Sequence, residues 1–207
     1  MTIRIFAAGA LTALLALTTI AAPAVAQVAS QDTAAVKAGA YKVEAYHTQV
    51  GFSLSHFGFT NYSGYFSNAS GTLTLDPANP AVTKLDVSVP ISSLLTTVPV
   101  LDSQLKGDQW FDAAKFPTAT FVSTQITRTG ADTATIAGDL TLHGVTKPIT
   151  LKARLIGSGN DPILKAFAVG FEATGDINRS DFGIKQYLPL VGDDVTLTIA
   201  GAFLLQP

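Results

Sequence analysis

The sequence of 207 residues predicts an all-β protein, a single antiparallel β-barrel of eight strands with short helical turns in one long connection. Short segments of alternating apolar and polar residues follow one another, with turn-forming Gly, Pro, Asn and Asp between them, which is typical of β-strands. No long segment has the 3.6-residue periodicity of the helices that cover a parallel sheet. Closing the sheet into a barrel then removes the exposed edges of an open sheet.

The clearest strand pair spans residues 136–155. Apolar or small side chains occupy alternate positions on both sides of a His143-Gly144 turn, at Ile136, Gly138, Leu140 and Leu142 and at Ile149, Leu151, Ala153 and Leu155. This pattern predicts a β-hairpin with one face in the core and the other in water. Further strands are expected at 50–54, 73–75, 85–89, 120–126, 169–173 and 195–203.

Residues 91–117 break the alternation. Asp102 and Asp108 stand at positions typical of helix N-caps, so we expect two short helical turns. Large apolar side chains are also more frequent here than a solvated loop keeps exposed. We therefore expect this connection to lie over one end of the barrel, either as a plug that completes the core or as a lid at an entrance.

The N-terminal segment has the pattern of a signal peptide. One charge, Arg4, precedes an apolar run at 5–20, and Ala24-Val25-Ala26 forms a small-x-small cleavage site. We expect a signal peptide at 1–26 rather than an uncleaved anchor, a flexible leader at 27–40 and one β-barrel domain at 41–207. The expected location is therefore periplasmic or secreted.

Composition excludes some kinds of site and partner. The chain has no cysteine, so it has no disulfide, no thiolate metal site and no thiol for lipid attachment. Its formal net charge is −2 and its basic residues are scattered, which argues against nucleic acid as a partner.

Three motifs in order carry a resemblance to a known family. The 138–151 hairpin is preceded by Trp-Phe-Asp-Ala-Ala-Lys-Phe-Pro at 110–117 and followed by Ile-Asn-Arg-Ser-Asp-Phe-Gly at 177–183. Together with His-Thr-Gln-Val-Gly-Phe-Ser at 47–53, they resemble the YceI-like polyisoprenoid-binding family from Tyr41 to the C-terminus. The resemblance implies a lipocalin-like barrel that holds one long apolar lipid, an isoprenoid quinone, another polyisoprenoid or a fatty acyl chain. It implies no metal, no cofactor and no catalysis.

The residues expected to contact the lipid are inward apolar side chains of the strands and of the long connection. They are Phe52, Leu54, Phe57, Leu94, Leu101, Leu105, Trp110, Phe111, Phe116, Phe121, Leu140, Leu142, Phe171, Ile177, Phe182 and Leu197. Small residues at inward positions, among them Ala153, Ala173 and Gly201, leave space for a ligand in a barrel of this size. Alternatively, the glycines mark bulges that let the strands coil.

Other functions remain open at this point. A hydrolase or metal enzyme at the barrel rim would use His47, His56 and His143, but no two of them have the spacing of a helical zinc motif. A third alternative is a structural stress-response protein with a filled barrel. Arg179 either braces its loop or contacts the ligand. Transient membrane contact and a homodimer are also left open.

Overall fold

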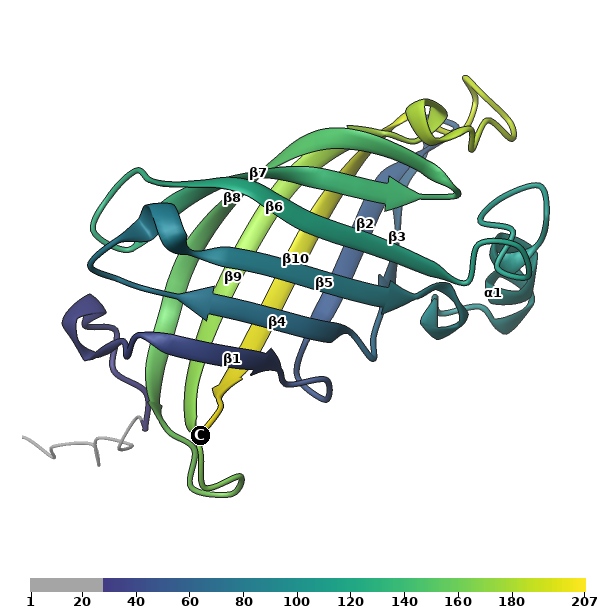
Figure 1. The fold of residues 1–207 in the computed structure, drawn as a ribbon. Helices are drawn as coiled ribbons and strands as arrows, with labels where there is room; N and C mark the ends of the chain where they lie inside the picture. The colour runs from purple at the N-terminus through teal and green to yellow at the C-terminus, as the bar shows by residue number, and fades with distance from the viewer. Residues whose placement is uncertain (1–27) are drawn as a thin grey trace, which may run out of the picture.

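The computed structural model describes residues 28–207, so the predicted signal peptide at 1–26 lies outside the described residues. The described chain forms one antiparallel β-sheet with one α-helix and short 3-10 turns (Figure 1). Among these residues, no helix has both the length and the apolar content that crossing a bilayer needs. The strands are β1 Gly39–Val43, β2 Gln49–His56, β3 Thr60–Phe66, β4 Ser70–Leu75, β5 Lys84–Pro90, β6 Thr118–Arg128, β7 Thr133–Leu142, β8 Val145–Asn160, β9 Phe167–Asn178 and β10 Asp194–Leu205. The helical elements are η1 Thr33–Ala35, η2 Pro80–Val82, η3 Ile91–Ser93, α1 Pro99–Lys106 and η4 Arg179–Phe182.

Eight of these strands close into a barrel, as the sequence predicts. The order around the ring is β1, β4, β5, β6, β7, β8, β9 and β10, with neighbouring strands hydrogen-bonded to each other. The pairing of β1 with β10, from Tyr41 opposite Leu205 to Val43 opposite Phe203, closes the ring. The fold is therefore an antiparallel eight-stranded barrel.

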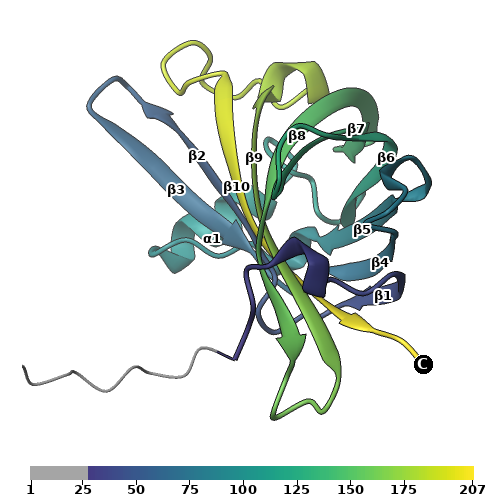
Figure 2. The same ribbon diagram turned by 90° about the vertical axis from the view of Figure 1, so that its left-hand side faces the viewer.

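Strands β2 and β3 form a hairpin beside this ring. Strand β10 is long enough for two partners on one side, because its residues 196–200 pair with β2 and its residues 203–205 pair with β1. Figure 2 shows the β2–β3 hairpin leaving the barrel wall at the point where β10 changes partner. The alternating segment at 50–54 is thus a strand, but it lies on a side branch of the sheet.

The predicted hairpin between β7 and β8 is confirmed. His143 and Gly144 have φ values of 52° and 74°, and Leu142 pairs with Val145 directly across them. Two successive positive φ values form the turn whose twist matches that of the paired strands, and glycine tolerates this conformation without strain. Ile136 lies opposite Leu151, so the two apolar runs share one face.

The connection at 91–117 contains η3, α1 and then a series of turns, and it differs from the predicted pair of capped helices. Pro99 begins α1 and Val98, its N-cap residue, makes no side-chain capping bond. Asp102 lies inside the first turn, where its carboxylate accepts hydrogen bonds from the backbone N–H and the hydroxyl of Thr96, both at 2.6 Å. No helix begins at Asp108. Asp102 therefore holds the chain that enters the helix, and its negative charge still suits the N-terminal turn.

The N-terminal segment 28–38, which we call the strap, lies against the barrel, and its side chains are exposed or only partly buried. Ser30 and Ser158 of β8 exchange two backbone hydrogen bonds of 2.8 Å, and Val36 packs against a core cluster that includes Tyr41. A Cβ at Gly157 would lie 3.0 Å from Ala29, and one at Gly159 would lie 2.9 Å from the Val28 carbonyl oxygen. These two glycines in β8 thus give the strap room to approach the sheet.

Candidate binding cavity

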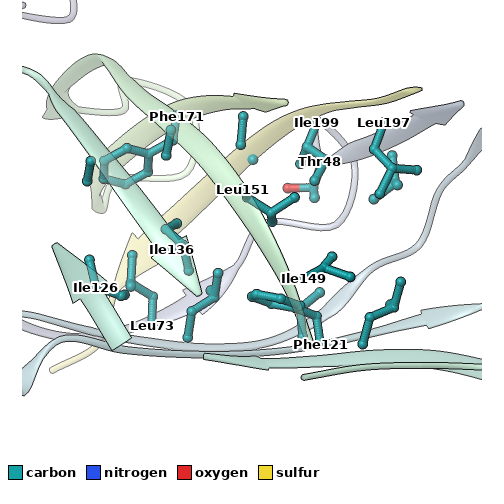
Figure 3. A pocket seen from close by; sticks show the side chains of 18 of the residues that line it. Thr48, Leu73, Phe121, Ile126, Ile136, Ile149, Leu151, Phe171, Leu197 and Ile199 are labelled. Carbon is teal, nitrogen blue, oxygen red and sulfur yellow. The ribbon is translucent and has the colours of Figure 1, made fainter. Parts of the chain in front are cut away.

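The barrel encloses a cavity of about 660 Å³ that runs along its interior. Figure 3 shows inward side chains from opposite walls facing one another across it, almost all of them hydrocarbon. Alternation along the strands produces this lining, since Phe171 and Ala173 line the cavity while the alternate residues Glu172 and Thr174 are exposed to solvent. The labelled lining residues are Thr48, Leu73, Phe121, Ile126, Ile136, Ile149, Leu151, Phe171, Leu197 and Ile199.

Small residues in the walls explain part of this space. Ala153, Ala173 and Gly201 all line the cavity, and Ala153 lies directly opposite Ala173. Two other glycines, Gly138 and Gly175, make room for neighbouring side chains, the ring of Phe121 and the methyl group of Leu151. The barrel is therefore not filled by its own side chains.

Many inward apolar side chains are only partly buried, although they point away from bulk solvent. Leu140, Phe171 and Leu197 line the cavity and retain accessible surface toward it. Apolar surface of this kind is the driving force for taking up an apolar ligand, because binding removes it from contact with water.

One end of the cavity is closed by the 91–117 connection. Trp110 and Leu105 line this end and are 9% and 8% exposed, and Ile184 from the loop after η4 is 3% exposed. They belong to a core cluster that also contains Leu94 and Phe182. Of the two roles left open by the sequence, the structure supports the plug.

Arg179 is a buried cation at the closed end. Its guanidinium donates to the backbone carbonyl oxygens of Gly192, Ile184, Gln186 and Val191, at 2.8 to 3.0 Å. Its Cζ also lies 5.4 Å from the centre of the Trp110 ring, a cation–π distance. Burial lowers the pKa of the Arg179 guanidinium, and the charge of Asp193 opposes this shift. Arginine nevertheless stays protonated in proteins, so Arg179 braces its loop as a charged group.

The opposite end of the cavity is open. Ala34, Ala78, Arg128, Ala131 and Asp132 line it and are exposed to solvent. They come from η1, from the connection between β4 and β5, and from the end of β6 and the turn that follows it. In Figure 1 these elements lie at the end of the barrel opposite α1. The mouth is therefore at the strap end.

Most of the predicted site residues line the cavity. These are Phe52, Leu54, Leu105, Trp110, Phe111, Phe121, Leu140, Leu142, Phe171, Ile177 and Leu197. The structure brings them together from five strands, β2, β6, β7, β9 and β10, and from the long connection. Whether they contact a lipid stays a prediction.

Five predicted residues do not line the cavity. Leu94 and Phe182 are each 1% exposed within the core cluster, and Leu101 packs against that cluster. Phe116 packs edge-on against His143, with 4.7 Å between the ring centres. Phe57 is 41% exposed, because it lies in the turn of the β2–β3 hairpin, outside the ring. For these residues the sequence showed that the side chain is apolar but not which way it points.

Sequence reasoning missed lining residues of two kinds. Those on strands, such as Leu73, Ile126 and Ile199, follow the same alternation as the predicted ones and could have been found by extending it. Those at the mouth, at 33–36 and 76–80, lie outside regular strands, and no sequence pattern marks them.

The three histidines are separate and have local partners. His47 Nδ1 lies 2.6 Å from Glu44 Oε2, and His56 packs against Phe57. His143 Nδ1 lies 3.0 Å from the Phe182 carbonyl oxygen. Within residues 28–207, no three His, Cys, Asp or Glu side chains form a group that could hold a metal ion.

A closed antiparallel barrel around an apolar cavity with one open end defines the class of lipocalin-like barrels. Residues 41–203 match the YceI-like domain, and the chain belongs to this family. It is 41% identical over 162 residues to Protein YceI of Escherichia coli O157:H7, an alignment that covers 77% of this chain and 84% of that protein.

Two solved structures show the same architecture. The Campylobacter jejuni YCEI protein is similar with a TM-score of 0.64 and 30% identity, over 74% of this chain and 90% of that one. A polyisoprenoid-binding domain from Saccharophagus degradans has a TM-score of 0.60 over 82% of this chain and 100% of that one. Because that domain is 16% identical, its similarity supports the fold alone.

Proposed function

We propose that this protein binds one long apolar lipid inside its barrel, a polyisoprenoid, an isoprenoid quinone or a fatty acyl chain, and sequesters or carries it. The observation that carries the proposal is the cavity of about 660 Å³ with its almost wholly apolar lining. The polyisoprenoid-binding domain from S. degradans has the same barrel fold, so a ligand of this class is compatible with the fold.

The size of the cavity suits a single long chain. With about 30 Å³ for each water-sized group, it holds about 20 methylene-sized groups. At about 0.8 kcal/mol for each methylene removed from water, the gross gain is about 16 kcal/mol. Ordering the chain and losing its translational freedom offset about 4–8 kcal/mol of this gain. The remainder is compatible with micromolar to nanomolar affinity, about 8–12 kcal/mol.

The protein acts by binding rather than by catalysis in this proposal. Arg179, the charged side chain at the closed end of the cavity, is engaged by four backbone carbonyl groups, and the histidines lie apart from one another. The signal-peptide pattern at 1–26 supports export to the periplasm or the medium. Loading from a membrane would then involve transient contact with it.

A matched pair of substitutions in β9 tests the proposal. Ala173→Trp places a large ring in the cavity, whereas Thr174→Trp places the same ring on the solvent face. Uptake of cis-parinaric acid, a polyene fatty acid that fluoresces in apolar surroundings, should fall at least tenfold in affinity for Ala173→Trp, the equivalent of about 1.4 kcal/mol. Thr174→Trp should bind like the unaltered protein. Equal uptake by two folded variants would contradict binding in the cavity.

A further inference from the structure

The two ends of the cavity differ in exposure and in polarity, and this difference bears on how a lipid lies inside. At the closed end, the cavity is lined by the buried apolar side chains of Leu105, Trp110 and Ile184. At the mouth, polar side chains line the cavity in contact with solvent, including those of Arg128 and Asp132.

The charged residue at the closed end has little capacity left for a ligand. Of the five N–H groups of Arg179, four donate to backbone carbonyl oxygens, one from Nε, one from Nη1 and two from Nη2. The Trp110 ring covers the guanidinium. A polar head group at this end would exchange its hydration for one remaining N–H group, which is unfavourable for any group that needs several hydrogen bonds.

The mouth offers the opposite environment. Arg128 uses Nε and one Nη2 hydrogen on the carbonyl oxygens of Gly130 and Ala131, so its other N–H groups face solvent or a ligand. Thr33 and Thr133 add hydroxyl groups to the same rim. A head group at this rim keeps contact with water, and a hydrocarbon chain extending inward from it meets only a few polar side chains.

We propose that a single-chain lipid lies in this barrel tail-first, with its chain end against Trp110 and its head group at the rim formed by residues 33–36, 76–80 and 128–134. The inference rests on the proposed function, since it describes how the lipid occupies the same cavity. It also assigns the head-group site to the strap end, away from the 91–117 connection.

Trp110 can report this orientation because it is the only tryptophan of the chain. The probes are two stearic acids that carry a quenching doxyl group at carbon 5 or at carbon 16. Native mass spectrometry first establishes equal occupancy by each acid. The 16-doxyl acid should then quench Trp110 emission several-fold more strongly than the 5-doxyl acid.

A second protein moves the reporter to the mouth. Trp110→Phe combined with Ala78→Trp places the single indole at an exposed position of the rim. In this variant the 5-doxyl acid should quench more strongly than the 16-doxyl acid. The reversal controls for differences in the intrinsic efficiency of the two probes.

The outcomes separate the orientation from the proposed function. Bound acids that quench Trp110 equally, or more strongly from carbon 5, would overturn the tail-first orientation and leave lipid binding intact. Absence of occupancy by both acids in mass spectrometry would contradict the proposed function and the orientation with it.

Discussion

Replacing Arg179 by methionine should strongly destabilise the fold, because methionine keeps much of the side-chain volume and donates no hydrogen bond. The change leaves four carbonyl groups of residues 184–192 without their donor, and two of these bonds, to Ile184 and Val191, are fully buried. An unpaired buried acceptor costs about 1–3 kcal/mol, and the contact with Trp110 contributes about 1 kcal/mol. The expected loss in free energy of unfolding is therefore about 3–7 kcal/mol.

Urea denaturation followed by far-ultraviolet circular dichroism measures this loss without relying on the neighbouring tryptophan. Arg179→Lys keeps the charge but cannot span four carbonyl groups, so it should retain only a minor part of the stabilisation. Arg154→Met is the matched control, because Arg154 forms a solvent-exposed ion pair of 3.0 Å with Glu172. Such pairs contribute about 0–1 kcal/mol.

The reasoning would be refuted by an Arg179→Met protein as stable as Arg154→Met. That result would mean that water or a rearranged loop satisfies the carbonyl groups without the guanidinium. Arg179 would then be free for a role other than bracing, and contact with a ligand would become the better explanation of its position at the cavity.

Three further predictions concern the wall, the strap and the histidines. Leu142→Asp places a charge in the core and should unfold the barrel or abolish lipid uptake, whereas Thr141→Asp on the outer face should do neither; equally mild melting curves would contradict the assigned faces. Ser30→Cys with Ser158→Cys should form a disulfide, since hydrogen-bonded pairs have Cα atoms about 5.5 Å apart. Oxidation should slow lipid entry, and reduction should restore it. An unchanged rate of lipid entry would show that the strap does not control access to the cavity. Replacing all three histidines by glutamine should leave lipid affinity within a few-fold; loss of bound metal or of a turnover would favour an enzyme.

Local patterns predicted seven of the eight ring strands, β4 to β10, because each shows its own alternation, but not β1, which closes the ring. Leu142, His143 and Val145 are an example, since the turn type, the register and the inward face all follow from adjacent residues. The barrel class follows in turn, because many such segments without covering helices leave closure as the way to remove sheet edges. Local sequence was sufficient for these features.

The missed features depend on contacts between distant segments. Strand β10 pairs with β2 up to Ala200 and with β1 from Phe203 onward. The sequence contains no local sign of this change of partner, because the alternation along the strand continues through Ala200 as it does before it. Docking of the strap depends on Gly157 and Gly159, about 130 residues further along the chain. The location of the mouth likewise depends on which loops meet over each end, so the sequence predicted an apolar lining but not the direction of entry.

The measurement that tests lipid binding most directly is native mass spectrometry of the protein purified from its own cell envelope, followed by solvent extraction. The account predicts one apolar lipid for each chain, released by the solvent and regained when the stripped protein is mixed with the extract. It also predicts that Ala173→Trp, purified in the same way, carries none. Protein that is free of lipid when isolated and takes up none from the extract would contradict the account.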